Sequence, residues 1–247
     1  MNTILITGCS SGFGLEIAKH FLDRDWNVIA TMRTPRADVL PASPRLRILP
    51  LDVSDERSIR AAIDAAGPID VLVNNAGIGL LGAVEGISMT KVREIFETNT
   101  FGTIAMTQAV LPHMRERKSG VVINVTSSVT LKSLPLLAVY TGSKMAVNGF
   151  TESLALELAP FGVRAHVVLP GRAPGTRFAE NAGPRMEGNI PESYAGLAAA
   201  VFENFKDVSQ VTHARDVAEA VWQAATDPAA PVRIPAGEDA KAWAAGA

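Results

Sequence analysis

The sequence has little that would build a disulfide scaffold, a metal site or a membrane span. Its 247 residues include one cysteine, Cys9, which has no partner for an intrachain disulfide, and four histidines without the spacing of metal ligands. No apolar run reaches the roughly 18 residues that a membrane-spanning helix needs, and the N-terminus lacks the basic and apolar regions of a secretory signal. We therefore expect a cytoplasmic protein with no metal site and no membrane contact.

An excess of charge of either sign is also lacking. The chain has 23 lysines and arginines against 25 aspartates and glutamates, a formal net charge of -2, so no global field attracts nucleic acid. Hydrophobic residues make up 47% of the chain, which excludes intrinsic disorder as its main state. The length suits one large α/β domain or two small domains.

Short apolar runs rich in β-branched residues alternate with longer helical patterns, which is typical of βαβ units. We predict a single doubly wound α/β domain over residues 1–247, with a seven-stranded parallel sheet and helices on both faces. The predicted strands are Thr3–Thr7, Asn27–Thr31, Arg47–Leu51, Asp70–Asn74, Gly120–Thr126, Val163–Leu169 and Val232–Pro235. The predicted helices are Gly14–Asp23, Ser54–Ala65, Ser88–Arg117, Leu137–Ala159 and Ala214–Thr226.

Two segments interrupt this alternation. Residues 34–46 contain three prolines, so we expect mostly loop there. Residues 171–212 carry several glycines and prolines and only one clear helical run, roughly Glu192 to Phe205. Because long irregular stretches in compact domains are usually functional, we predict a substrate lid over residues 171–212.

A glycine-rich turn, Thr7–Gly14, lies between the first predicted strand and the first predicted helix. Gly8, Gly12 and Gly14 permit a tight turn and the close backbone approach that a pyrophosphate needs, and the helix N-terminus supplies free N–H groups. The glycine spacing differs from the usual dinucleotide-binding pattern. A strand-to-helix turn without a ligand therefore stays open as an alternative.

The residues after the second predicted strand bear on the choice between NADP and NAD. A fold selective for NAD places an acidic residue there to bind the adenosine ribose, whereas this chain has Arg33. A guanidinium group suits a 2′-phosphate through bidentate, charge-assisted hydrogen bonds, so NADP(H) is favoured. Three further arginines, for which a solvated basic loop is the preferred interpretation, are Arg36, Arg45 and Arg47.

Tyr140 and Lys144 are four residues apart in a predicted helix, so they lie on one face of it, one turn apart. The ammonium group is expected to lower the pKa of the Tyr140 phenol and prepare it as an acid or base near neutral pH. Ser127 ends a predicted strand at the C-terminal edge of the sheet, where ligands bind, with Ser128 as the alternative hydroxyl. Asn99, a poor helix former inside a predicted helix, indicates a distortion that carries a water molecule.

Seven segments together resemble the short-chain dehydrogenase/reductase family in order and spacing, over nearly the whole chain. The segments are TGCSSGFG, LDV (Leu51–Val53), NNAG (Asn74–Gly77), the Asn99 helix, the NVTSS strand end, YTGSK and LPG (Leu169–Gly171). The resemblance implies a single-domain Rossmann fold that binds a nicotinamide dinucleotide.

The resemblance also implies which positions bind the cofactor. Arg33 matches the position that binds the 2′-phosphate in NADP-preferring members. Asp52, next to Val53, matches the one that binds the adenine amino group, and Asn75 and Gly77 are implied contacts on the adenosine ribose side. The implied pyrophosphate contacts are Gly8, Ser10, Ser11, Gly12, Phe13 and Gly14.

Asn99, Ser127, Tyr140 and Lys144 match the family's catalytic tetrad, which implies hydride transfer between the nicotinamide and a carbonyl carbon. Tyr140 is implied to donate a proton to the substrate oxygen while Ser127 hydrogen-bonds the same oxygen. Tyr140 and Lys144 also contact the cofactor, Lys144 through the nicotinamide ribose hydroxyls, and Asn99 anchors a proton-relay water. The competing hypothesis is a non-catalytic dinucleotide-binding protein that acts as a redox sensor or binds a partner.

Apolar residues around the predicted catalytic helix and in the predicted lid suggest the substrate class. An apolar or aromatic ketone, aldehyde or secondary alcohol would fit a wall of such residues, although they suit a core or a subunit interface equally well. The resemblance further implies a homodimer or homotetramer paired through the two long predicted helices. The candidate wall residues are Val129, Leu131, Leu134, Leu136, Leu137, Tyr194, Leu197 and Phe202.

The chain departs from the family's pattern after Gly171, itself an implied cofactor contact. The family has a threonine four residues after this glycine, whereas Thr176 lies five residues after it, so its contact with the cofactor is open. Arg172 is an unusual charge that either binds an acidic group of the substrate or faces solvent. Cys9 is expected to be a packed small residue rather than a redox switch, and Trp243 near the C-terminus either docks on a neighbour or frays.

Overall fold

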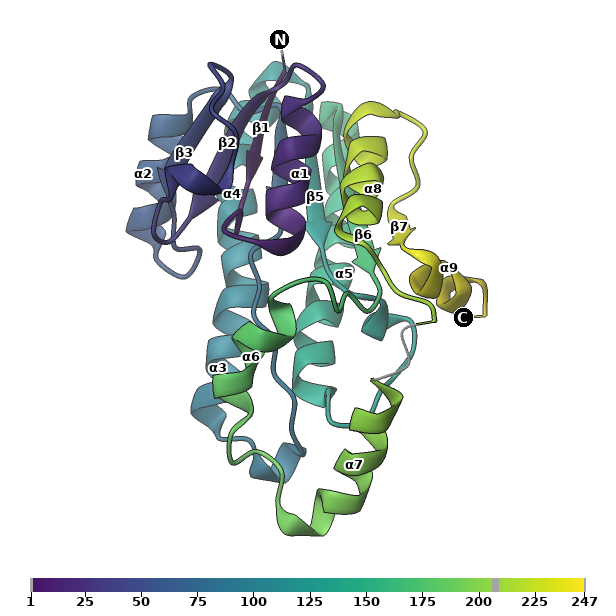
Figure 1. Cartoon of the computed structure of the whole chain (residues 1–247). Helices are drawn as coiled ribbons and strands as arrows, with labels where there is room; N and C mark the ends of the chain where they lie inside the picture. The colour runs from purple at the N-terminus through teal and green to yellow at the C-terminus, as the bar shows by residue number, and fades with distance from the viewer. Residues whose placement is uncertain (1, 206–208, 247) are drawn as a thin grey trace.

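The apolar runs form a seven-stranded sheet in the computed structural model of the chain, and all neighbouring strands are parallel (Figure 1). The strand order is β3-β2-β1-β4-β5-β6-β7. The predicted Rossmann fold with a seven-stranded parallel sheet is therefore confirmed. The strands are β1 (Thr3–Ile6), β2 (Asn27–Met32), β3 (Leu46–Pro50), β4 (Val71–Asn74), β5 (Gly120–Val125), β6 (Val163–Pro170) and β7 (Arg233–Ala236).

The structure describes residues 2–205 and 209–246. Residues 206–208 of the predicted lid, and residues 1 and 247 of the predicted domain, lie outside this range. The α-helices of the described part are α1 (Gly12–Leu22), α2 (Glu56–Ala66), α3 (Met89–Phe96), α4 (Gly102–Arg117), α5 (Ala138–Leu158), α6 (Phe178–Met186), α7 (Ala195–Asn204), α8 (Ala214–Thr226) and α9 (Glu238–Ala245).

Helices cover both faces of the sheet, because successive residues of a strand point to opposite faces. Ile4 and Ile6 of β1 belong to a buried core with residues of α1 and α8, whereas Leu5 belongs to a second core with residues of α2, α4 and α5. Figure 1 shows α1 and α8 in front of the sheet and α4 and α5 behind it. Burial on both faces explains why the strand sequences are continuously apolar.

The parallel direction of the strands brings their C-terminal ends to one edge of the sheet. Thr7 follows β1, Asn75 follows β4 and Ser127 lies shortly after β5, so residues far apart in the sequence meet at this edge. β1 pairs with β2 on one side and with β4 on the other, and open α/β sheets bind ligands where the strand order reverses in this way. Helices α6 and α7 lie below this edge in Figure 1.

The helices differ from the prediction in three places. The predicted helix Ser88–Arg117 divides into α3, a π-helical turn (Glu97–Phe101) and α4, which confirms the distortion expected at Asn99. The predicted lid helix begins with a separate 3₁₀ turn, Glu192–Tyr194, before α7. Helices α6 and α9 were not predicted, because α6 has a proline inside it and the alanine-rich α9 lacks a pronounced apolar face.

Candidate active site

The glycine-rich turn after β1 has the shape of a phosphate-binding turn. Gly8 and Gly12 have φ angles of 76° and 60°, which other residues rarely adopt, and a side chain at Gly14 would collide with the Gly8 carbonyl. Ser11 at the start of α1 makes no side-chain cap with any described residue, and the first turn of α1 carries no acidic residue. The N–H groups of this turn therefore fit the pyrophosphate of a dinucleotide.

Asn75 holds the glycine turn from the neighbouring strand end. Its side-chain amide donates to the carbonyl oxygens of Thr7 and Gly8, at 2.9 and 3.1 Å. Ser10 is exposed on the turn, whereas the Phe13 ring packs partly against the core under α1. Asn75 thus shapes the turn itself, and its implied ribose contact stays a prediction.

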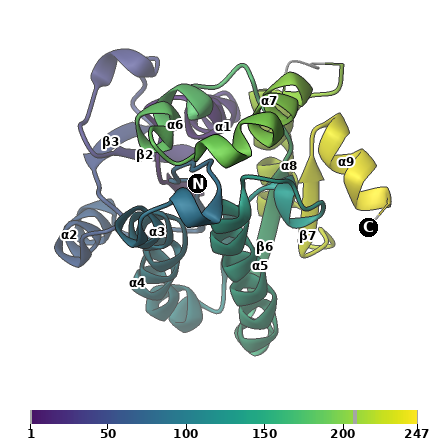
Figure 2. The same cartoon turned by 90° about the horizontal axis from the view of Figure 1, so that it is seen from below.

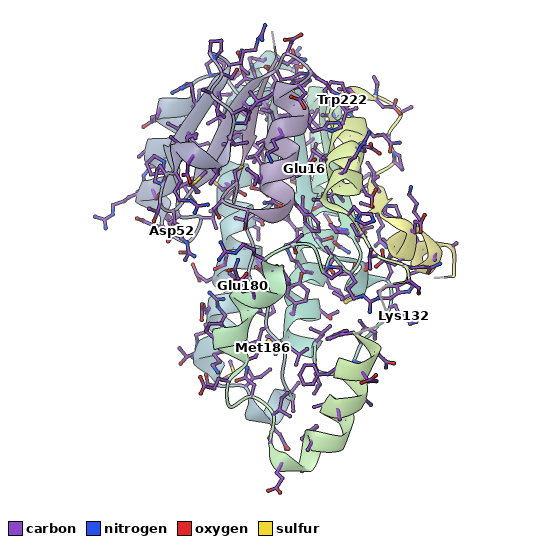
Figure 3. All side chains as sticks on the ribbon, in the orientation of Figure 1. Glu16, Asp52, Lys132, Glu180, Met186 and Trp222 are labelled. Atoms are coloured by element: carbon purple, nitrogen blue, oxygen red, sulfur yellow. The ribbon has the colours of Figure 1, made fainter. Side chains whose placement is uncertain are left out.

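Arg33 and Asp52 lie near each other at the ends of β2 and β3. Arg33 is exposed, and Figure 3 labels Asp52 at the lower edge of the sheet. Hydrogen bonds from Ser54 hold the pKa of the Asp52 carboxyl below its usual value, and the positive charge of Arg33 acts in the same direction. Val53 is buried against Gly102 of α4. The two residues predicted to bind the adenosine end of the cofactor are therefore brought together.

The three other arginines of this segment differ in their contacts. Arg45 forms an ion pair of 2.9 Å with an aspartate after α1. Arg47 donates to a carbonyl at the C-terminus of α2, at 3.1 Å, where a cation is favoured. Arg36 donates to the Ser10 carbonyl in the glycine turn, at 3.2 Å. Arg33 and Arg36 therefore supply positive charge near the turn, whereas Arg45 and Arg47 stabilise other parts of the fold.

The side chains of Ser127 and Tyr140 meet at the end of β5. Tyr140 lies in the first turn of α5 and is only 7% exposed, and the Ser127 hydroxyl is close enough to its phenol to act on the phenol's pKa. Ser128 is buried, and the Thr126 hydroxyl bonds to the backbone of β6. Ser127 rather than Ser128 is therefore the hydroxyl that accompanies Tyr140.

Burial, rather than the neighbouring ammonium, governs the acidity of Tyr140. Desolvation raises the pKa of Tyr140 to about 12, and the hydrogen bond from Ser127 opposes this only in part. Desolvation also lowers the pKa of Lys144 to about 8, so the ammonium form of Lys144 is itself disfavoured. The expected lowering of the Tyr140 pKa by Lys144 is therefore wrong, and the phenol is protonated at neutral pH.

Asn99 and Lys144 lie on either side of the chain that follows β4. Asn99 Oδ1 accepts from the Ile78 N–H at 2.8 Å, and Asn99 Nδ2 donates to Ser143 Oγ at 3.2 Å. Lys144 Nζ donates to a carbonyl of β5 at 3.1 Å. A side chain at Gly77 would come within 3.2 Å of Asn99 Oδ1 and 3.3 Å of Lys144 Nζ. Glycine at position 77 therefore gives both polar groups room at the site.

The lid contributes an aromatic residue that the sequence analysis did not single out. The centroid of the Phe178 ring lies 5.8 Å from that of Tyr140, and a Cβ at Gly79 would be 2.8 Å from the Phe178 ring. Thr176 packs against Gly12 of the glycine turn, so the lid contacts both parts of the site. Figure 2 shows α6 and α7 over the ends of the strands. The one sequence feature that pointed to Phe178 is its place directly after the irregular GRAPGTR segment.

Five of the eight apolar residues predicted to line the substrate divide into two groups. Leu136 lies in a small core between the lid and the segment before α3, and Leu137 and Tyr194 pack against that core. Leu197 and Phe202 on α7 are instead 43% and 40% exposed. The first group therefore stabilises the lid, as the alternative interpretation held.

Three residues for which the sequence left two interpretations open, Arg172, Cys9 and Trp243, have definite surroundings. The Arg172 guanidinium donates to a carbonyl at the end of α7, at 2.9 Å, so it binds the lid. Cys9 is fully buried, and burial raises the pKa of its thiol to about 12, as suits a packed residue. The Trp243 ring of α9 lies 5.2 Å from the ammonium of Lys132, which Figure 3 labels. The C-terminal segment thus docks within its own chain.

Neither metal ligation nor a membrane span is found in residues 2–205 and 209–246. No group of three or more His, Cys, Asp or Glu side chains there would hold a metal ion. No helix there has the length and apolar character needed to cross a membrane. The cytoplasmic location stays a prediction.

A glycine turn that fits a dinucleotide lies at the same edge of the sheet as the half-buried Ser127 and the buried Tyr140 and Lys144, an arrangement that defines the class of dinucleotide-binding Rossmann proteins. The family model described as short chain dehydrogenase matches residues 2–187. The chain belongs to the short-chain dehydrogenase/reductase family.

Two of the curated relatives each match about two-thirds of this chain. YusZ of Bacillus subtilis (strain 168), an uncharacterized oxidoreductase, is 44% identical over 178 residues, which cover 68% of this chain and 63% of YusZ. Retinol dehydrogenase 8 of Homo sapiens is 39% identical over 180 residues, which cover 68% of this chain and 58% of that protein. The chain thus spans less than two-thirds of the length of these relatives.

Solved structures match nearly the whole chain. A short-chain dehydrogenase from Streptomyces avermitilis has a TM-score of 0.83 and 32% identity, covering 99% of this chain and 91% of the other. Serine dehydrogenase complexed with NADP+ has a TM-score of 0.82 and 28% identity, and the match covers 96% of this chain and 95% of that protein. A short-chain dehydrogenase/reductase from Burkholderia phymatum in complex with NAD has a TM-score of 0.80 and 25% identity, covering 95% and 88%. Structural neighbours thus bind either NADP or NAD.

Proposed function

We propose that the chain is an NADP(H)-dependent oxidoreductase of the carbonyl reductase or alcohol dehydrogenase type. Its substrate would be an apolar or aromatic ketone, aldehyde or secondary alcohol. The observation that carries this proposal is the nearness of the Ser127 hydroxyl to the buried Tyr140 phenol, with Lys144 one turn along α5. This group lies at the same edge of the sheet as the glycine turn, so a dinucleotide on that turn would extend toward it.

A bound nicotinamide dinucleotide would supply or accept the hydride, and side chains of the protein would donate and return the proton. Because burial keeps the Tyr140 phenol protonated at neutral pH, Tyr140 can donate its proton to the carbonyl oxygen of the substrate. Ser127 donates a hydrogen bond to the same oxygen, where negative charge develops. Lys144 holds the nicotinamide ribose hydroxyls, and Asn99 anchors a water that returns a proton.

The proposed cofactor contacts follow the edge of the sheet. The backbone of the glycine turn, from Gly8 to Gly14, binds the pyrophosphate. Asp52 binds the adenine amino group, and Gly171 contacts the nicotinamide end. Since the structural neighbours bind NADP or NAD, the choice of NADP(H) depends on Arg33 at the end of β2, supported by the nearby Arg36.

The apolar character of the proposed substrate follows from the lid. The Phe178 ring lies beside Tyr140, and Leu197 and Phe202 on α7 are further exposed apolar side chains of the predicted lid. Retinol dehydrogenase 8, one of the relatives, has a name that indicates an apolar alcohol as its substrate.

Exposed apolar side chains on the helices behind the sheet support a homodimer or homotetramer. Met145 and Leu156 of α5 are 54% and 79% exposed, and Phe101 before α4 is 54% exposed. Such side chains are typical of subunit interfaces. Sedimentation of the purified chain would show a dimer or a tetramer.

Replacement of the proposed proton donor tests the reaction. Tyr140→Phe removes only the hydroxyl, so we expect kcat for ketone reduction to fall by about 10²-fold or more, while the affinity for NADPH stays within about twofold. A panel of apolar and aromatic ketones with NADPH, followed by loss of the reduced nicotinamide absorbance, measures the rate. Tyr194→Phe, the only other tyrosine substitution that the sequence offers, is the matched control and should keep its activity. Full turnover by Tyr140→Phe would overturn the mechanism.

A further inference from the structure

A buried polar cluster lies behind Gly171, outside all the motifs named above. It joins three segments: the end of β6, the residue two positions before α8, and the start of α9. Its polar side chains, Thr212 and Asp239, are only 2% and 5% exposed. Figure 1 shows α9 following β7 at the edge of the sheet.

The two side chains bind consecutive backbone groups at the end of β6. The Gly171 N–H donates to Thr212 Oγ1 at 2.9 Å, and the Arg172 N–H donates to Asp239 Oδ2 at 2.6 Å. Thr212 Oγ1 also lies 2.8 Å from Asp239 Oδ1, and the Thr212 N–H donates to the Arg172 carbonyl at 2.8 Å. The backbone at positions 171 and 172 is therefore held at three points.

Two glycines make room for this cluster. A side chain at Gly171 would collide with the Asp239 carboxylate, and a side chain at Gly237 would collide with the Thr212 hydroxyl. Gly237 also has a φ angle of 94°, which other residues rarely adopt. The close packing on both sides shows that Thr212 and Asp239 have fixed positions against the backbone.

The backbone held by the cluster leads directly into the lid. Arg172 binds the end of α7 through its guanidinium, at 2.9 Å. Four residues further on, Thr176 packs against Gly12 of the glycine turn, and Phe178 then lies beside Tyr140. The direction of the chain at Gly171 therefore decides whether the lid covers the cofactor turn and the catalytic tyrosine.

We propose that Asp239 is a positioning residue that, together with Thr212, sets the 171–176 segment over the cofactor and so raises the affinity for the dinucleotide. The inference rests on the proposed function, because Gly171 is assigned to the cofactor there. A carboxylate suits this position because it only accepts hydrogen bonds, and Asp239 accepts from Arg172 and from the Ala240 N–H. An asparagine would turn a donor toward one of these N–H groups and leave it unsatisfied.

Two substitutions and two matched controls test this role. We expect Asp239→Asn and Thr212→Val to raise the dissociation constant for NADPH about tenfold. Asp239→Asn turns a donor toward a buried N–H, and Thr212→Val leaves the Gly171 N–H with only its longer bond to the Ala236 carbonyl, at 3.3 Å. Thr212→Ser keeps the hydroxyl and should bind NADPH within about twofold of wild type. Asp70→Asn should do the same, because the Asp70 carboxylate accepts from Thr3 at 2.8 Å and pairs with Arg117 at 3.0 Å at the opposite edge of the sheet.

Amide hydrogen exchange without cofactor provides a readout that does not depend on turnover. The peptide covering residues 169–178 should exchange faster in Asp239→Asn and Thr212→Val than in wild type, and at the wild-type rate in both controls. Unchanged exchange there, or faster exchange with unchanged NADPH affinity, overturns the positioning role. If Asp239→Asn does not fold, the comparison of Thr212→Val with Thr212→Ser tests the positioning role by the same two measurements. Wild-type protein that binds neither NADPH nor NADH overturns the proposed function, and this role with it.

Discussion

A single side chain at the end of β2 carries the proposed choice of cofactor. Arg33 is exposed at the sheet edge beside Asp52, and Arg36 reaches the glycine turn. The other two arginines of the segment, Arg45 and Arg47, are occupied by an aspartate and by a helix C-terminus. The positive charge available to a 2′-phosphate is therefore smaller than the sequence count suggests, and Arg33, next to Asp52, is the candidate to bind it.

Arg33→Ala should weaken NADPH binding by about 10- to 100-fold, the range for a lost charge-assisted hydrogen bond, and leave NADH binding unchanged. Titration of both cofactors by protein fluorescence measures the two affinities. Arg45→Ala removes an arginine of the same segment that pairs with Asp25 on the surface, so it should alter neither affinity. An Arg33→Ala protein that keeps its preference for NADPH would show that the 2′-phosphate assignment is wrong.

At the scale of elements, the predicted lid is anchored at the bend between α6 and α7 as well as at its start, residues 171–172. Asn189, between α6 and α7, is only 1% exposed. Its side chain accepts from Lys91 Nζ at 2.7 Å and donates to the Arg185 carbonyl at 2.7 Å, and its own carbonyl accepts from the Ala83 N–H at 3.0 Å. A side chain at Gly82 would collide with Asn189. The bend of the lid is therefore fixed to the segment before α3 and to α3 itself.

Asn189→Ala should lower the free energy of unfolding by about 1–3 kcal/mol, because it leaves buried polar groups without partners. Residues 173–205 should also become easier to cleave with a protease, since the bend no longer holds the two lid helices. Urea unfolding and limited proteolysis measure these effects. Asn181→Ala, on the exposed side of α6, is the matched control, and equal cleavage of the two variants would contradict the anchoring role.

At the scale of the whole molecule, burial of Lys144 links stability to pH. The pKa of Lys144 falls from 10.5 to about 8 on folding, because burial disfavours the ammonium. Between these two values the unfolded chain binds a proton that the folded protein does not, so stability rises with pH across this window. Below pH 8 the ammonium is charged in both states, and its burial cost, on the order of 3 kcal/mol, is fully present.

Lys144→Met removes this cost, so the variant should be more stable than wild type at pH 7, and its advantage should shrink as the pH rises to 9.5. Tyr140 has the opposite effect, because its pKa is raised on folding to about 12. The stability that it contributes is lost only as the pH rises above about 10, and this loss is the same in wild type and in Lys144→Met. Urea unfolding of wild type and variant at several pH values measures the difference. An advantage that stays constant from pH 7 to 9.5 would contradict the linkage.

Much of the fold was predictable because it depends on local patterns. Continuous apolar runs such as that of β5 indicated a sheet covered on both faces, and the glycine turn and the Tyr140 to Lys144 spacing marked the two parts of the site. Asn99 in a predicted helix indicated the distortion that the π-helical turn confirms. Helices α6 and α9 were missed because their packing, of Phe178 on Tyr140 and of Trp243 on Lys132, is not visible in their own sequences.

By itself, the sequence determined the family, the sheet and the identity of the candidate catalytic residues, since periodicity and motif spacing are properties of neighbouring residues. Only the tertiary structure decided the acidity of Tyr140, because burial depends on every element packed around the ring. It also decided the contacts of Gly171, whose chain segment binds Thr212 and Asp239, 41 positions from Gly171 and 67 from Arg172. Such contacts form only when distant segments fold together.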